Sequence, residues 1–267
     1  MAGSRYLELR WPGTCGSCAA PLAPGTRAWW NAERKSTTCI GCRPVERAPT
    51  DRTQGSRAGA SAQREYERRK ANDERRVRKL HPHTGGLRLK LRGEPQHLTA
   101  WAKGAEGERL LGAALDVLAS ESVRVLHDRR VPGGPGNIDH VVVTPGAVYV
   151  VDAKRHRNKK VEKREKGGLF RTDTRLYVGG RDGTGMLDGM ARQVEAVHHA
   201  VGAGPPVHPV LCFIDAEWGL FAKPFVIRGV LVCPPKAFYK RVKADGRGGC
   251  AHVADLAERL ASKLPPA

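Results

Sequence analysis

Regularly spaced apolar residues are concentrated after Trp101, and there they predict an α/β domain. From Gly104 to Leu118 they recur every three or four positions, which is typical of a helix with one buried face. The runs Asn137–Val143 and Ala147–Ala153 are rich in Val and flank a Thr-Pro-Gly turn, so they predict a hairpin of two strands. The same patterns predict a second hairpin around Asp173, strands at Val123–Leu126, Val207–Asp215 and Phe225–Cys233, and helices at Met186–Val201, Pro235–Val242 and His252–Lys263.

Residues 43–100 have few large apolar residues. Residues 43–60 are rich in Arg, Pro, Gly, Ser and Thr, which indicates a flexible linker. Residues 61–80 contain strong helix formers without Gly or Pro, so they predict an exposed basic helix. Leu87, Leu89 and Leu91 alternate with basic residues, as in a short amphipathic strand or an extended strap. We therefore expect an N-terminal module at 1–45, a basic linker with its helix at 46–100, and the α/β domain at 101–267.

The net charge of the chain indicates what kind of partner it binds. The 267 residues include 46 Lys and Arg against 27 Asp and Glu, for a net charge of +19. Such an excess favours a polyanionic partner, of which nucleic acid is the leading candidate. Transmembrane and secretory segments are not expected, because no apolar run reaches about 20 residues and the N-terminus lacks an apolar core. We expect a cytoplasmic protein that does not use a membrane, in which cysteines are reduced or bind metal.

Four of the seven cysteines form two pairs, Cys15-Gly-Ser-Cys18 and Cys39-Ile-Gly-Cys42. Two such pairs can surround one Zn²⁺ with four thiolates, which leaves no open position for catalysis and predicts a structural site. A redox pair and free thiols are the alternatives. A small core around the metal is expected from Leu22, Trp29, Trp30 and Ile40. The remaining Cys212, Cys233 and Cys250 are interpreted as small buried residues.

Charged side chains occur at one end of the first predicted hairpin. Asp139 begins one strand, and Asp152 and Lys154 end the other. Side chains two positions apart lie on the same face of a strand, so Asp152 and Lys154 share a face and the hairpin brings Asp139 near them. Buried like charges are costly unless a cation compensates, and Mg²⁺ prefers oxygen ligands of this kind. Each residue taken alone has a simpler interpretation as a solvated charge at a strand end.

This arrangement resembles the nuclease-related domain (NERD) family of the PD-(D/E)XK nuclease superfamily. Four elements carry the resemblance over about residues 100–215: Gly104-Ala-Glu-Gly107-Glu108 at the start of a helix, Ile138-Asp139-His140, Asp152-Ala-Lys154, and Gln193. Two positions depart from the superfamily pattern. Ile138 replaces the Pro, and Asp152 stands where many members have Glu.

The resemblance implies a restriction-endonuclease-like mixed sheet flanked by helices, here preceded by a small zinc-ribbon-like module. It implies that Asp139 and Asp152 bind Mg²⁺ or Mn²⁺, with the Ala153 carbonyl as a further ligand. It also implies that Lys154 orients water or stabilises charge, that Glu108 contributes to metal binding, and that Gln193 positions water or phosphate. DNA as the substrate rests on the resemblance alone. His140 and Glu106 point to other faces and receive no role.

A basic run from Lys154 to Lys166 begins at this candidate site. We expect Arg155, Arg157, Lys159 and Lys160 to contact the DNA backbone, the alternative being a solvated loop. The predicted function is a Mg²⁺-dependent DNA endonuclease with little sequence specificity, in which the zinc module assists docking. The alternative is a non-catalytic nucleic-acid-binding protein that uses the nuclease fold as a platform. The sequence leaves the oligomeric state open, a homodimer included.

Overall fold

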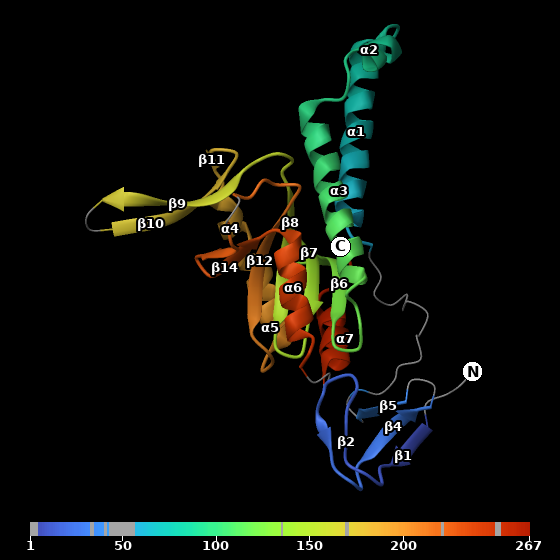
Figure 1. Cartoon of the computed structure of the whole chain (residues 1–267). Coiled ribbons are helices and arrows are strands. Elements are labelled where there is room, and N and C mark those ends of the chain that lie inside the picture. The colour runs from blue at the N-terminus through green and yellow to red at the C-terminus, as the bar shows by residue number, and fades with distance from the viewer. Residues whose placement is uncertain are drawn as a thin grey trace.

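A six-stranded mixed sheet forms the centre of the α/β domain (Figure 1). The computed structural model describes residues 5–32, 35–39, 42, 57–134, 136–168, 171–219, 222–248 and 252–267. The strand order is β13-β14-β12-β8-β7-β6, in which β12 runs parallel to both β8 and β14 and the other neighbours are antiparallel. The strands are β6 (Arg124–Arg130), β7 (Asn137–Val143), β8 (Val148–Arg155), β12 (Val207–Ile214), β13 (Phe225–Ile227) and β14 (Val230–Cys233).

Helices cover both faces of this sheet, so the expected α/β class with a flanked mixed sheet is confirmed. Val142, Tyr149 and Val151 pack toward α3 (Gln96–Asp116) and α6 (Pro235–Asp245). Val141, Val143 and Val150 lie on the opposite face with α4 (Gly185–Gly189), α5 (Ala191–Val201) and α7 (Val253–Lys263). Because successive side chains of a strand alternate between faces, Asp139, Asp152 and Lys154 belong to the α5 face.

Strongly apolar strands were predicted well, and polar ones were not. β7 has the predicted bounds, and β8 and β12 differ from prediction by one or two residues at their ends. The strand predicted at Val123–Leu126 continues through polar residues to Arg130 as β6, because other elements bury Arg129 and its neighbours. The predicted single strand Phe225–Cys233 is instead the hairpin β13–β14, which turns at Arg228 and Gly229 with φ of 50° and 80°.

A helical arm extends from the sheet, as Figure 1 shows. It consists of α1 (Ala60–Leu80), α2 (Gly85–Leu91) and the first half of α3, with α1 and α3 packed side by side. The helix predicted at 61–80 is confirmed, whereas the strand or strap predicted for Leu87–Leu91 is wrong, because no neighbouring strand pairs with this segment and it coils into α2. In the described part of the chain, no helix has the length and apolarity to span a membrane.

The base of the arm docks on the α/β domain. Ala62 is buried, and Ser61 donates to the Asp128 carboxylate from its backbone N and its hydroxyl, at 2.6 and 2.5 Å. Docking depends on small residues, because a Cβ at Gly59 would lie 2.7 Å from the Ala105 carbonyl oxygen. The predicted domain boundary at residue 101 falls inside α3, and residues 43–56 of the predicted linker lie outside the described residues.

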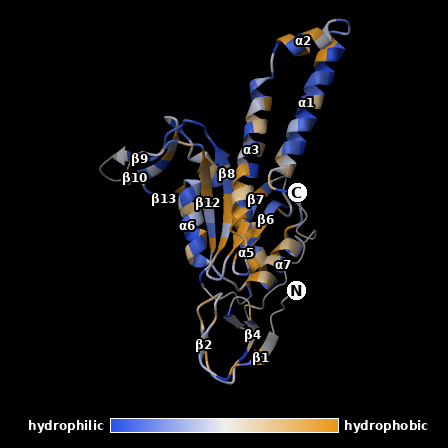
Figure 2. Ribbon diagram, turned by 45° about the vertical axis from the view of Figure 1, so that its right-hand side comes forward, coloured by the Kyte–Doolittle hydropathy of each residue, from blue (hydrophilic) through white to orange (hydrophobic). Residues whose placement is uncertain are grey.

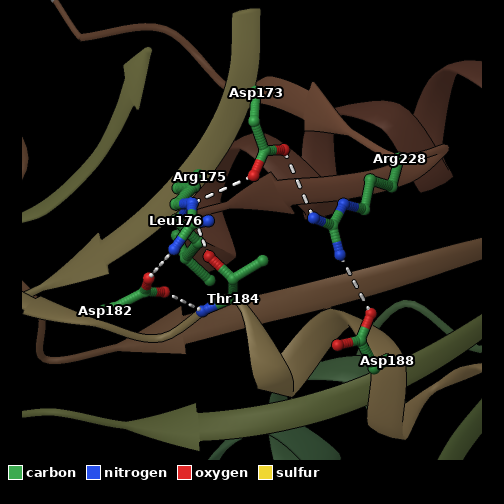
Figure 3. A network of polar contacts seen from close by, with 7 residues as sticks. All are labelled: Asp173, Arg175, Leu176, Asp182, Thr184, Asp188 and Arg228. Carbon is green, nitrogen blue, oxygen red and sulfur yellow. Dashed lines mark hydrogen bonds and ion pairs between the residues drawn. The ribbon is translucent and has the colours of Figure 1, made fainter. Parts of the chain in front are cut away.

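A ribbon also extends from the α/β domain, to the left in Figure 1, and it is a sheet of three strands in the order β11-β10-β9, of which β11 (Arg181–Asp182) is the shortest. It pairs β9 (Val161–Gly168) with β10 (Arg171–Val178), so the predicted second hairpin exists, but Asp173 lies within β10 and not at the turn. Figure 3 shows how the base of the ribbon is held: Arg175 bonds Asp173 and Asp182, and Arg228 bridges Asp173 and Asp188 of α4. These ion pairs fix the ribbon to α4 and to the β13–β14 turn.

The N-terminal module is built from short strands. β1 (Arg5–Glu8), β4 (Arg27–Asn31) and β5 (Ser36–Cys39) form one sheet, and β2 (Gly13–Thr14) pairs with β3 (Pro21–Leu22). Its core contains Leu22 as predicted, together with Ala28 and the buried Cys15 and Cys42. Trp29 and Trp30 are only half-buried, because they lie on a sheet too small to cover them, and Ile40 lies outside the described residues.

Candidate metal centres

The four N-terminal cysteines converge. Cys15, Cys18, Cys39 and Cys42 place their sulfur atoms within 4.8 Å of one another. The Cys18 and Cys39 Sγ atoms are 3.9 Å apart, close to the edge of about 3.8 Å that four thiolates at about 2.3 Å from one Zn²⁺ would have. The Cys39 backbone N donates to Cys15 Sγ at 3.3 Å, a bond that supports a thiolate. The donor set and its spacing fit zinc and are compatible with the predicted module.

A second centre lies at the end of β8. The Lys154 Nζ is 2.6 Å from Asp152 Oδ1, and the Ala153 backbone N donates to Asp139 Oδ2 at 2.8 Å. Asp152 is buried, while Asp139 and Lys154 are half-buried. The structure therefore brings together the two aspartates and the lysine that the sequence placed at one end of the hairpin.

Glu108 reaches this centre from α3. Gly107 makes the approach possible, because a Cβ there would lie only 2.8 Å from the Arg155 Cβ on β8. The Glu108 side chain is buried, and its Oε2 makes no hydrogen bond within the described residues. Glu106 points elsewhere and pairs with Arg109, which agrees with the expectation that it takes no part.

The charges of these groups act on one another. Burial, followed by the charges of Asp128 and Asp152, raises the pKa of Glu108 to about 7. Burial raises the pKa of Asp139 well above its ordinary value, and Glu108 and Asp152 add to the effect. Burial opposes the charge of Lys154, but Asp152 and Asp139 outweigh it, so the net pKa of Lys154 is raised. The site thus holds more negative charge than one lysine neutralises, which favours a further cation or protons.

The three carboxylates lie farther apart than the four cysteine sulfur atoms. In the part of the chain that the structure describes, the cysteine cluster is the one set of three or more such side chains whose ligand atoms all lie within 4.8 Å. Glu108, Asp139 and Asp152 therefore do not form an equally compact set. Gln193 lies on α5, over the same sheet face, with its Oε1 buried and without a hydrogen bond among the described residues. Among the described residues, no hydrogen bond joins Gln193 to the three carboxylates or to Lys154.

The predicted DNA contacts differ in exposure. Arg157 and Lys160 have side chains that are 71% and 59% exposed, and Lys159 is also exposed. Arg155 differs from the expectation, because its side chain is 13% exposed and its Nε donates to Asp215 at 2.8 Å. Its position under Gly107 explains why solvent reaches so little of it.

Sequence reasoning missed the polar groups on β6. Asp128 has a φ of 49° and interrupts the regular pairing of β6 with β7, which directs its carboxylate to Ser61 and to Asn137 Nδ2. His127 lies between His140 and Asp116, at 2.8 Å from each. The polar sequence of β6 resembled a loop, so it gave no signal for either arrangement. His140 is buried on the face opposite Asp139, as expected for neighbouring strand residues.

Comparison with known proteins identifies the central part of the chain. Residues 103–214 match the model of the family described as nuclease-related domain, NERD. The match begins in α3 just before Glu108 and ends with β12, so it contains the whole carboxylate centre and Gln193. No curated protein and no solved structure matches the chain.

Proposed function

Because residues 103–214 are a nuclease-related domain, we propose that the chain is a Mg²⁺-dependent endonuclease that hydrolyses DNA with little sequence preference. The observation that carries the proposal is the buried, unbonded Glu108 Oε2 beside Asp152 and Lys154 at the end of β8. A carboxylate oxygen without a partner is costly in a buried position, so its presence favours a ligand that binds there.

The donor set fits a hard divalent cation. Asp139 and Asp152 would hold Mg²⁺ or Mn²⁺, with the Ala153 carbonyl and Glu108 as further oxygen donors. Such an ion, when bound, polarises a phosphate and lowers the pKa of a bound water. The excess negative charge of the site, expressed in the raised pKa of Glu108 and Asp139, supports this assignment.

The remaining residues of the site have separate tasks in this proposal. Lys154 keeps its proton and can donate to a phosphate oxygen or orient the attacking water. Asp139 fixes the backbone at Ala153 through its hydrogen bond, which sets the position of Asp152 and Lys154 on either side. Gln193 retains a free side-chain oxygen for water or phosphate.

Nucleic-acid binding is assigned to exposed cations beside the site. Arg157, Lys159 and Lys160 follow directly on β8 and can contact the backbone without reading bases. We propose that Arg155 instead supports α3 through its position under Gly107, and that the zinc module assists docking.

The test is cleavage of plasmid DNA. With Mg²⁺ or Mn²⁺ the protein should nick the plasmid, and EDTA should stop the reaction, whereas Ca²⁺ should support binding with little cutting. Asp152→Ala and Lys154→Ala should each reduce the rate at least about a hundredfold, because an ion ligand or a charge donor is lost. Asp188→Ala is the control. Asp188 is exposed, lies on α4 and not on β8, and pairs with Arg228.

The outcome also decides between enzyme and platform. If the wild type binds DNA but cuts no single-stranded, duplex or branched substrate with any of these ions, and Asp152→Ala behaves like it, the endonuclease proposal fails. The non-catalytic binding platform then takes its place.

A further inference from the structure

The tip of the helical arm carries a concentrated positive charge. Residues 75–92, which include the end of α1 and all of α2, contain seven Lys or Arg residues and no Asp or Glu. The basic residues are Arg75, Arg76, Arg78, Lys79, Arg88, Lys90 and Arg92, and all of them are exposed. Family membership does not explain this segment, because it lies before the matched residues 103–214.

The arm divides into a neutralised middle and an unneutralised tip. In the middle, Glu65 binds Arg68 and Arg69, and Glu94 lies 3.8 Å from Lys70. At the tip, Arg92 pairs back to Asp73. Within the described residues, the other six tip cations have no carboxylate partner, although Arg75 and Arg88 bond Asn72 and His81. The carboxylates of the arm thus neutralise cations near its middle, and most cations at the tip stay available to bind another molecule.

Apolar side chains accompany these cations. Leu80, Leu87 and Leu91 are 64%, 61% and 77% exposed, and Figure 2 shows apolar residues on α2 above an otherwise hydrophilic α1. A helix this exposed has no core of its own to hold it, so contact with a partner would explain its composition. Apolar side chains next to cations occur in proteins that press a wedge against stacked bases as well as in those that bind lipid surfaces.

The tip has a fixed relation to the carboxylate centre. α1 is one unbroken helix that starts at Ala60 and ends in the tip, and a Cβ on Gly59, the residue before it, would lie 3.5 Å from the Glu108 Cβ. At the base, Ala62, Trp101, Gly104 and Glu108 line a cavity of about 230 Å³ between α1 and α3. The 21 residues of α1 span about 31 Å, which is the length of about nine base pairs of duplex DNA.

We infer that the tip of the arm is a second nucleic-acid contact, which grips the phosphate backbone of a double helix about nine base pairs from the carboxylate centre. The inference rests on the proposed function for its choice of partner, and it adds a requirement for duplex of sufficient length. A duplex is stiff over this distance, so one end held at the centre can run along the arm to the tip.

Two other partners for the tip, a second copy of the chain and a lipid surface, fit these features less well. A second copy of the chain would bring two such cationic tips together, which their repulsion opposes. A lipid surface would satisfy the cations and leucines, but it would make no use of α1, the helix that joins the tip to the neighbourhood of Glu108. Nucleic acid uses both features, and this is why we choose it.

The test compares two variants that lose the same charge. Arg76, Arg78 and Lys79 are replaced together by Gln, which keeps helix propensity. The control replaces Lys236, Lys240 and Lys243 by Gln; these lysines are exposed on α6 and form no ion pair within the described residues. Binding of labelled 8- and 24-base-pair duplexes is measured by fluorescence anisotropy in Ca²⁺ over a salt series, and circular dichroism confirms that both variants fold.

The tip variant should bind the 24-base-pair duplex at least about tenfold more weakly than the control and lower the salt slope by about 2. On the 8-base-pair duplex the two variants should agree, because this duplex is too short to reach from the centre to the tip. Equal binding of the long duplex by both variants overturns the inference. So does tip-dependent sedimentation with phosphatidylserine vesicles combined with unchanged duplex binding, which would assign the tip to lipid. Because binding is read without cutting, failure of the endonuclease proposal shows separately, as uncut plasmid with the wild type.

Discussion

The two candidate metal centres differ in how far the protein alone assembles them. The four cysteine sulfur atoms of the N-terminal module lie within 4.8 Å of one another. At the end of β8, by contrast, Glu108, Asp139 and Asp152 come from three elements, do not reach the same compactness, and share one lysine. A closed site that serves folding benefits from a complete ligand set, whereas a site for chemistry must keep room for water and phosphate. The difference therefore agrees with the proposal of a structural zinc site and an open magnesium site.

The largest effect is expected on the thiolate centre. Cys39→Ser should release zinc and unfold residues 1–42, because zinc binding contributes on the order of 10 kcal/mol to modules of this kind. The α/β domain should stay folded, since its core contains none of the four cysteines. Elemental analysis gives the zinc content, and hydrogen exchange gives the protection of each part. Ser17→Ala, between two of the ligands, should change neither. Freshly purified reduced protein without zinc would defeat this prediction.

A smaller effect, dependent on pH, is expected at Glu108. Its pKa is raised to about 7, so between pH 4.5 and 7 the folded state binds more protons than the unfolded state. The free energy of unfolding of the metal-free protein should therefore fall as pH rises through this interval. Glu108→Gln cannot ionise at this position, so it should avoid this loss: up to roughly 3 kcal/mol of the free energy of unfolding at pH 8, and little at pH 4.5.

Thermal unfolding between pH 4.5 and 8, with and without Mg²⁺, measures this effect. Mg²⁺ should stabilise the wild type more at pH 8 than at pH 6, and should stabilise Glu108→Gln less. Glu106→Gln is the control, because Glu106 is paired with Arg109 at the surface. A wild type whose stability rises with pH over this interval would contradict the assignment of a buried acidic centre.

The smallest effect concerns the packing that places Glu108. Gly107→Ala would put a Cβ 2.8 Å from the Arg155 Cβ, so α3 must move from β8, at a cost of about 1–3 kcal/mol. Mg²⁺ affinity should fall with it, while zinc content stays unchanged. Gly104→Ala has no atom within 4 Å of the new Cβ and should be neutral or slightly stabilising. Calorimetric titration with Mg²⁺ compares the two, and equal affinities would show that this close approach does not set the site.

The sequence predicted the parts of the fold whose signal is local. β7 and β8 combine Val-rich runs with a Pro-Gly turn, and their ends carry the charges of the site, so both the hairpin and the convergence of Asp139, Asp152 and Lys154 followed from spacing. The cysteine cluster followed in the same way, because two short pairs determine where four sulfur atoms meet.

The parts of the fold that the sequence did not predict depend on contacts between residues distant in sequence. The arm docks through Ala62, Gly59 and Ser61, residues too small or too polar to give a hydrophobic signal, and Ser61 meets Asp128 across 67 positions. The alternation of Leu87, Leu89 and Leu91 indicated a strand only on the assumption that a sheet lay beside it. On β6, burial of Arg129 by other elements overrides the polar sequence.

The packing of α3 against α1 has a thermodynamic consequence. α3 carries Glu108 and packs against α1, which carries part of the tip, so a displacement of α1 is also a displacement of a candidate metal ligand. Two ligands that act on helices packed in this way are linked, and the coupling free energy is the same in both directions. If a molecule held at the tip tightens Mg²⁺ binding at Glu108 by some factor, Mg²⁺ must tighten binding at the tip by that factor.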